Sequence, residues 1–409
     1  MKMDVMILNT SVLDLRSEDF AFTGKLAGAG GLALCETADM PPYTQAELMG
    51  YIANGKSSAG GGGNTAPLLA HAGLRVAVGS NLGKGDFNGL DAQGRTFHDI
   101  LTANGVDMSA TIIHPTLPTG TTFIHEVPHG ERGGIAYFPN ANNDFDFEVF
   151  KKEVLRLSPT VAYYMYSGLS KRGDANAGKD LADFIVWCRE QGCITIVDSH
   201  TLCGNPHELI KRGIAVPAYR LLEPLLGELD IFFTSVDEAR MIRNTLEREG
   251  CDHGEDTQAS IHGFLNFMKR RFTGKSGRPQ LFGVTVKNGA YTLYVDAQGD
   301  TDGVTFCESR YMAVGKVVDL VGAGDSFRAG LIGYITRHRD AFLDGTLNVA
   351  EAVQSGNLMA TLYVTAPLTD RYSNIPKLEA LLAVVRDGKH YTEEAALKQT
   401  LLHGHEYPV

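Results

Sequence analysis

The residues best suited to chemistry lie in one stretch, 317–330, which reads VVDLVGAGDSFRAG. An apolar run precedes two glycines, Gly322 and Gly324, and Asp325 and an apolar helical repeat follow them. We therefore expect a short buried strand, a glycine turn and a helix. The N-terminus of a helix carries unpaired N–H groups and a partial positive charge, so it can hold an anion. A carboxylate beside that anion can accept a proton from an attacking hydroxyl, as phosphoryl transfer requires.

An ordinary strand-to-helix turn, with the aspartate as a cap, shows the same local pattern. The longer string DLVGAGDSFRAG, residues 319–330, resembles the signature of the PfkB carbohydrate kinases, a ribokinase-like family whose motif is usually D-T-x-G-A-G-D-x-F-x-A-G. Leu320 departs from the threonine of that motif. The resemblance implies an ATP-dependent kinase with Asp325 as the general base. It also implies that the amides of Gly322, Ala323 and Gly324 stabilise the transferring phosphoryl group.

The rest of the chain must position these residues, and it alternates strand patterns with helical patterns. Strand patterns occur at 4–8, 74–79, 161–166, 194–198, 229–234 and 281–286. Such alternation predicts a parallel sheet with helices on both faces, and ligands of these sheets bind beyond the carboxyl ends of the strands. Alternating residues at 123–127 and 135–138 predict a hairpin. The resemblance implies that such strands form a β lid over the sugar, in an α/β, ribokinase-like three-layer fold with a mostly parallel central sheet.

We expect one kinase domain at residues 1–388, with lid segments at about 16–40 and 115–143, and a C-terminal tail at 389–409. The tail holds His403 and His405, which are spaced for metal binding. Because the sequence offers no third ligand, we interpret the tail as a surface segment.

Several polar residues match substrate contacts of the family. Asp14 follows the first predicted strand, where we expect a turn, and a carboxylate can accept two hydroxyl hydrogen bonds. The glycine-rich loop with Gly60, Gly61 and Asn64 resembles the family's first signature, although one glycine of the pair is missing. Asn142 ends the string Asn-Ala-Asn, which resembles the Gly-Ala-Asn at the end of the lid. The resemblance implies that all five bind substrate; without it they are ordinary turn, loop or cap residues.

Other positions match nucleotide and metal contacts. Ser235 and Glu238 resemble the N-x-x-E motif, whose acid organises Mg²⁺ through water, and Mg²⁺ keeps much of its hydration in proteins. Lys287 and Gly289 lie in a stretch that resembles T-x-G-x-x-G beside the nucleotide, and Asn357 resembles the asparagine that faces the adenine pocket. A helix cap at 235–238 and a solvent-exposed turn lysine are the alternatives.

Residues 50–57 match the P-loop pattern G-x-x-x-x-G-K-S. A P-loop follows a buried strand and opens a helix. Here the preceding residues look helical and glycines follow, so we interpret the match as chance.

Composition limits the classes of partner and compartment. The chain has 409 residues, enough for one large domain, and a net charge of −11, which argues against nucleic acid or an anionic membrane as partner. Its six cysteines include no C-x-x-C pair, and the N-terminus lacks a signal-peptide pattern, so we expect a cytoplasmic protein with reduced thiols. No apolar run approaches the roughly 20 residues that span a bilayer.

The sequence therefore predicts a kinase that transfers the γ-phosphate of ATP, with Mg²⁺, to a hydroxyl of a sugar or sugar derivative. Two alternatives stay open. One is a nucleoside kinase of the same fold, because the long insert after Asp14 resembles that of adenosine kinases. The other is a catalytically silent sugar-binding regulator. Activation by a monovalent cation and a homodimer formed through exposed lid strands also stay open.

Overall fold

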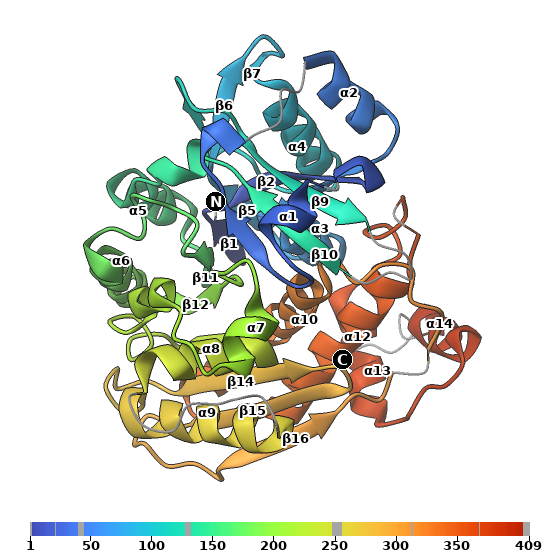
Figure 1. The fold of residues 1–409 in the computed structure, drawn as a ribbon. Coiled ribbons are helices and arrows are strands. Elements are labelled where there is room, and N and C mark those ends of the chain that lie inside the picture. The colour runs from blue at the N-terminus through green and yellow to red at the C-terminus, as the bar shows by residue number, and fades with distance from the viewer. Residues whose placement is uncertain are drawn as a thin grey trace.

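The computed structural model describes residues 2–20, 22–39, 45–126, 132–247, 256–311, 314–367 and 369–403. An eight-stranded sheet, of order β16-β15-β14-β13-β12-β11-β1-β5, forms the centre (Figure 1). Six of its strands are parallel: β1 (Val5–Leu8), β5 (Val76–Gly79), β11 (Val161–Ser167), β12 (Ile194–Ser199), β13 (Ile231–Ser235) and β14 (Gln280–Val286). The last two strands at one end of the sheet, β15 (Gly289–Val295) and the edge strand β16 (Val304–Glu308), are antiparallel. All six predicted strands are present, and the predicted α/β fold with a mostly parallel sheet is confirmed.

Helices cover both faces of this sheet because its strands are apolar on both sides. Along β1, Val5 and Ile7 belong to one hydrophobic core and Met6 and Leu8 to the other, as the alternation of side chains along a strand requires. The first core is built with α3 (Gly62–His71), α4 (Ala92–Ala103), α10 (Ala323–Arg337), α11 (Arg339–Leu343), α12 (Val349–Thr365), α13 (Leu378–Asp387) and α14 (Glu394–His403). The second is built with α5 (Phe147–Leu157), α6 (Lys179–Glu190), α7 (Pro206–Lys211), α8 (Val236–Leu246) and α9 (Thr257–Phe272).

A second sheet forms the lid. Its order is β3 (Leu32–Leu34), β10 (Arg132–Tyr137), β9 (Gly120–Glu126), β2 (Ser11–Ser17) and β4 (Ser57–Gly61). It has a small core of its own around Phe20 and Phe123, to which α1 (Thr23–Leu26) and α2 (Gln45–Ala53) contribute. The lid is thus larger than predicted, since β2 and β4 also belong to it. Asp14 consequently lies in a strand, not in the predicted turn. A third, small sheet joins β6 (Asn81–Gly85), β7 (Gly89–Leu90) and β8 (Ile112–His114).

Two other predictions need correction. Residues 317–321 form no strand; Val317 and Val318 are half exposed, and the N–H of Val318 donates to the carbonyl of Val364 at 2.8 Å. This segment meets the end of α12 instead of a sheet edge. The predicted surface tail is also packed as far as it is described, since Leu397 and Leu401 lie in the first core. His405, and residues 127–131 of the predicted hairpin turn, lie outside the described residues.

The resemblance of residues 50–57 to a P-loop has no structural counterpart. These residues end α2 and begin β4, the reverse of the strand-to-helix order that a P-loop needs. Lys56 forms an ion pair with Glu126, at 2.9 Å.

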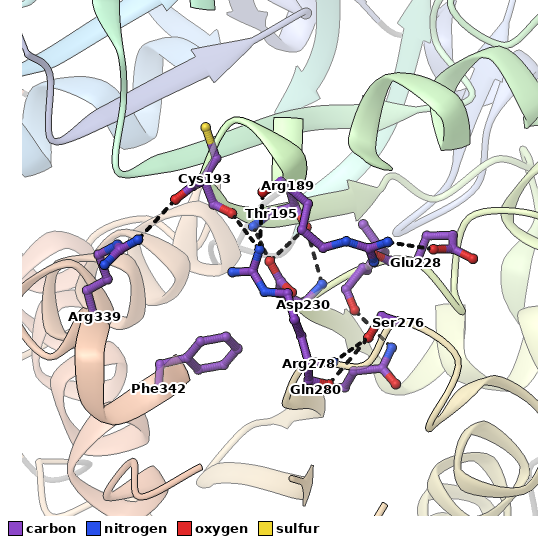
Figure 2. A network of polar contacts seen from close by, with 12 residues as sticks. Arg189, Cys193, Thr195, Glu228, Asp230, Ser276, Arg278, Gln280, Arg339 and Phe342 are labelled. Carbon is purple, nitrogen blue, oxygen red and sulfur yellow. Dashed lines mark hydrogen bonds and ion pairs between the residues drawn. The ribbon is translucent and has the colours of Figure 1, made fainter. Parts of the chain in front are cut away.

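A polar network joins the starts of three central strands (Figure 2). Asp230, just before β13, accepts hydrogen bonds from the N–H and the hydroxyl of Thr195 in β12, at 2.8 and 3.1 Å. Its other oxygen lies 3.3 Å from Nε of Arg278, which precedes β14. Burial raises the pKa of Asp230 to about 6, and the charge of Arg278 opposes this rise. The network therefore fixes the strand ends opposite those that carry the candidate site. Among the described residues, no helix combines the length and the apolar character needed to cross a membrane.

Candidate active site

A cavity of about 360 Å³ lies between the lid and the carboxyl ends of the central strands. The lid contributes Asp14 and Thr122, and the strand ends contribute Tyr166 and Asp198. Residues 320–325 of the glycine turn close one side. Ligands of open α/β sheets bind at this edge, so the cavity is the candidate active site.

The glycine turn brings Asp325 to the cavity. Gly322 caps α10 with a φ of 88°, and a Cβ there would lie 2.6 Å from Oη of Tyr363, so only glycine fits. Asp325 is 5% exposed. Tyr166 donates its hydroxyl to Oδ1 of Asp325 at 2.8 Å, and Asn64 donates Nδ2 to Oδ2 at 2.9 Å. These two donors fix the carboxylate at the N-terminal turn of the helix, as the sequence predicts.

The three predicted amide donors are not equivalent. The N–H of Ala323 already donates to the carbonyl of Leu320, at 3.1 Å, within the turn. The predicted role of Ala323 as a free amide for an anion is therefore not supported by this geometry. The N–H of Gly324 belongs to the first turn of α10, where no acceptor exists within the helix. The N–H groups of Gly324 and Gly322 therefore remain the better candidates for binding an anion.

Asp14 reaches the cavity from the lid. Thr122, on the neighbouring strand β9, donates its hydroxyl to Oδ1 of Asp14, and Gly60 on β4 lies directly against the carboxylate. Burial raises the pKa of Asp14 to about 6, and the charge of Arg16 and the bond from Thr122 oppose this rise. Asp14 is therefore ionised above about pH 6 and can accept hydrogen bonds from hydroxyls.

The glycine-rich loop supports both carboxylates. Gly61 has a φ of 57°, and a Cβ there would lie 2.3 Å from the carbonyl oxygen of Thr10, so glycine is required. Gly61 and Asn64 line the cavity, whereas Gly60 lies behind Asp14. Oδ1 of Asn64 accepts the hydroxyl of Tyr363 at 3.1 Å while its Nδ2 bonds Asp325. Asn64 thus orients Asp325, a role that the sequence analysis does not predict.

Asn142 has a structural role and does not line the cavity. It is fully buried, and its side chain accepts from the N–H of Ser11 at 3.2 Å and donates to the carbonyl of Ser11 at 2.9 Å. These bonds tie the loop after β10 to the first residue of β2. The prediction of Asn142 as a substrate contact is therefore not supported by the structure.

Ser235 and Glu238 line the cavity and also cap α8. They form a reciprocal capping box, so the alternative of a helix cap is correct. Burial alone would raise the pKa of Glu238, but the N–H of Ser235, the charge of Arg328 and the hydroxyl of Thr234 together lower it. An ionised Glu238 at the cavity edge fits a Mg²⁺ ion that is held mainly by phosphates and water. Among the described residues, no group of three or more His, Cys, Asp or Glu side chains could form a metal cage of its own.

Three predicted nucleotide contacts do not line the cavity. Lys287 is exposed at the tip of the β14–β15 hairpin, which agrees with the alternative interpretation of this residue as a solvent-exposed turn lysine. Gly289 is required because a Cβ would lie 2.2 Å from the carbonyl oxygen of Cys307 on the neighbouring strand. Asn357 is buried in α12, and its Nδ2 has no hydrogen-bond partner among the described residues.

The structure adds contacts that the sequence analysis does not predict. Tyr166, which holds Asp325, has a φ of 59°, a strained left-handed conformation that tyrosine rarely adopts outside functional sites. Asp198 and Arg328 form a buried ion pair at the cavity, with Oδ1 and Nη2 2.9 Å apart. Asp198 ends a predicted strand, and Arg328 occupies a variable position of the signature itself, so both had a signal in the sequence.

A further set of contacts ties the glycine turn to the C-terminal part of the chain. Asp319 pairs with Nη2 of Arg371 at 2.6 Å, and Nη1 of Arg371 donates to the hydroxyl of Tyr363 at 2.9 Å. The same hydroxyl bonds Asn64, so a continuous path of hydrogen bonds runs from Asp319 to Asp325. Arg16 of the lid lies 3.5 Å from Asp319.

Comparison with known proteins agrees with this geometry. The sequence model of the family described as "pfkB family carbohydrate kinase" matches residues 33–376 of the chain. The chain belongs to the PfkB family. No curated protein matches the chain in sequence. Membership of this family makes the chain a carbohydrate-kinase-type phosphotransferase that acts on an alcohol group, with ATP as the co-substrate that the family implies.

Solved structures show the same fold at low sequence identity. An adenosine kinase from Anopheles gambiae has a TM-score of 0.66 and 16% identity, with 92% of this chain and 99% of that chain covered. A fructokinase from Xylella fastidiosa with bound ATP has a TM-score of 0.60 and 18% identity, over 95% and 99% of the two chains. A probable sugar kinase from Rhizobium etli CFN 42 has a TM-score of 0.59 and 19% identity, over 89% and 94%.

Proposed function

We propose that this kinase transfers the γ-phosphate of ATP to a hydroxyl of a sugar or sugar derivative, with Asp325 as the general base. The observation that carries the proposal is the position of Asp325. Its buried carboxylate lies in the first turn of α10, beside the glycine turn, and two hydrogen bonds from Asn64 and Tyr166 hold it at the cavity. A base and an anion seat at one helix end are what an attacking hydroxyl and a transferring phosphoryl group need.

In the proposed mechanism, Asp14 accepts hydrogen bonds from substrate hydroxyls and directs one of them toward Asp325. The proton of that hydroxyl passes to Asp325 as its oxygen attacks the γ-phosphorus, and ADP leaves. The turn at Gly322 and Gly324 stabilises the charge on the transferring group. When bound with ATP, Mg²⁺ supplies positive charge at the phosphates, and Glu238 is the residue that would hold it through water. The lid excludes water, which would otherwise accept the phosphoryl group.

A nucleoside acceptor is the second candidate, and the lid side of the cavity favours it. Three apolar side chains of the lid strands line that side, Leu32, Ile124 and Ile135, and Leu169, just after β11, also lines the cavity. A flat apolar base can pack against such a surface, whereas a free sugar offers mainly hydroxyls. Several adenosine kinases are also among the similar structures, but this likeness shows only the fold.

ADP release with a panel of acceptors tests both candidates. The panel contains free sugars, sugar phosphates and nucleosides, each with ATP and Mg²⁺, and product phosphate is located by mass spectrometry. Asp325→Asn is the matched inactive control, because it keeps the side-chain shape and removes the proton acceptor. We expect at least one sugar or sugar derivative to be phosphorylated by the wild type and not by the variant.

Each outcome decides between the candidates. Phosphorylation of nucleosides alone would replace the sugar acceptor with a nucleoside. Calorimetric binding of a sugar without any phosphoryl transfer would support the silent regulator and contradict the kinase mechanism. The same assay with K⁺ exchanged for a large organic cation tests the predicted monovalent cation. Sedimentation tests the predicted homodimer.

A further inference from the structure

The charge of the cavity does not suit ATP unless a cation lies near the phosphates. Five carboxylates line the cavity: Asp14, Asp198, Asp237, Glu238 and Asp325. Among the described residues that line it, Arg328 is the one side chain with a permanent positive charge. Phosphoryl-transfer sites generally place an arginine or lysine at the transferring group, because charge accumulates there. The position of Arg328 therefore decides where this cavity can hold a phosphoryl group.

Arg328 lies at the glycine turn. It follows Asp325 by three residues on α10, so both side chains emerge from the same face of the helix. Nη1 of Arg328 is so close to Gly324 that a Cβ at that glycine would lie 2.9 Å from it. The guanidinium thus stands beside the backbone that forms the proposed anion seat.

One edge of the guanidinium is anchored and the other is available. Nη2 donates to Oδ1 of Asp198 at 2.9 Å and to the carbonyl of Phe233 at 3.2 Å. The side chains of Arg328 and Asp198 are 11% and 2% exposed, so the ion pair is nearly dry. Nη1 makes no hydrogen bond with the described residues. Because the guanidinium is a rigid plane, anchoring Nη2 fixes the direction of Nη1.

We propose that Arg328 is a catalytic residue whose Nη1 binds the transferring phosphoryl group at the glycine turn, with Asp198 as its positioning residue. This inference rests on the proposed function. In the step, the acceptor oxygen forms a bond to the γ-phosphorus while the bond from that phosphorus to the bridging oxygen of ADP breaks. The proton of the acceptor goes to Asp325, and Arg328 keeps its protons and donates hydrogen bonds to the phosphoryl oxygens throughout.

Three variants test this role in the full-length protein. Arg328→Met with Asp198→Asn removes both charges together, so it leaves no buried unpaired charge to unfold the chain. Arg328→Lys keeps the charge but cannot contact Asp198 and the glycine turn at once. Arg337→Met is the control, because it removes a half-exposed arginine from the same helix, which forms a surface ion pair with Glu379. Thermal unfolding is measured for each, and kcat and KM are measured with ATP and the best acceptor of the panel.

We expect the double variant to unfold near the wild-type temperature and its kcat to fall about 10³-fold, as for other arginines at transferring phosphates. We expect kcat of Arg328→Lys to fall about 10-fold to 100-fold, and Arg337→Met to match the wild type. A folded double variant with wild-type kcat would show that the ion pair only stabilises the fold, and would overturn the proposal. Wild-type kcat in Arg328→Lys would also overturn it, whether or not the double variant folds. A wild type without phosphoryl transfer, or an active Asp325→Asn, would instead refute the proposed function.

Discussion

Gly60→Ala should damage acceptor binding without a direct contact to the acceptor. A Cβ at residue 60 would lie 2.4 Å from Oδ2 and 2.5 Å from Oδ1 of Asp14. The backbone of Gly60 has no positive φ, so alanine adopts its conformation without strain and the effect comes from the contact alone. Asp14 and Gly60 lie on paired strands of the lid, which limits relief by backbone movement.

The size of the effect follows from the distances. An ordinary carbon contact begins near 3.4 Å, so the carboxylate has to move by about 1 Å, away from its bond with Thr122. A displacement of this size at a substrate-positioning group costs about 100-fold in rate. We therefore expect kcat/KM for the acceptor to fall about 100-fold, or about 2.7 kcal/mol, while KM for ATP changes little.

Steady-state ADP release at varied acceptor concentration measures this loss. Gly50→Ala is the matched control, since Gly50 lies in α2 of the same lid and a Cβ there meets nothing within 4 Å. It should keep full activity and gain about 0.5–1 kcal/mol of stability. Acceptor kcat/KM within about threefold of the wild type in Gly60→Ala would refute Asp14 as a substrate contact.

Three further predictions concern the base, acid pH and the far end of the sheet. Asp325→Asn should lower kcat by about 10²–10⁴-fold and leave acceptor affinity intact, because the amide oxygen can still accept from Nδ2 of Asn64 while the new NH2 can donate to the hydroxyl oxygen of Tyr166. Calorimetry and ADP release check this, and unchanged turnover would exclude Asp325 as base. Burial raises the pKa of Asp14 to about 6, so the acceptor-binding carboxylate is lost as the pH falls through about 6. Calorimetric acceptor affinity should weaken there in the wild type, and an equal dependence in Asp14→Asn would show that Asp14 is not the group responsible. Arg278→Met should lower the free energy of unfolding by about 3 kcal/mol, because the substitution leaves Asp230 buried without its cation. Urea unfolding measures this loss, and Arg278→Met combined with Asp230→Asn should recover part of the lost stability. A loss of stability no larger than that of Arg337→Met would contradict this prediction.

The sequence predicts the six parallel strands of the central sheet well because each is a short apolar run with a clear boundary, whereas it does not predict β15 and β16, of which β16 is largely exposed. The prediction of a strand at 317–321 is wrong, and the reason is physical. The β-branched residues of this segment favour a strand, yet no sheet edge is available there, and the backbone bonds the end of α12 instead. Local composition indicates what a segment prefers, and only the assembled fold decides what it can pair with.

The candidate site divides in a similar way. Asp325 and Gly322 are predictable because the signature is long and local. The partners of Asp325 are not, since Asn64 is 261 residues away in sequence and Tyr166 is 159 residues away. Asn142 and Lys287 match motif positions by residue type, but a type does not specify where a side chain points: Asn142 bonds the backbone of Ser11, and Lys287 is exposed at a hairpin tip. Arg328 lies within the signature, but only the closeness of its Nη1 to Gly324 in the fold indicates a role at the glycine turn.

The pairing of Arg16 with Asp319 has a consequence for the movement of the lid. Arg16 belongs to a lid strand and Asp319 to the segment that leads into the glycine turn, and their side chains are 8% and 19% exposed. Swinging the lid outward must pull Arg16 away from Asp319, and although Asp319 keeps Arg371 as its partner, little water is present to compensate the guanidinium of Arg16. The resting enzyme is thereby biased toward closure before any sugar or nucleoside arrives, and departure of the product has to overcome that same attraction.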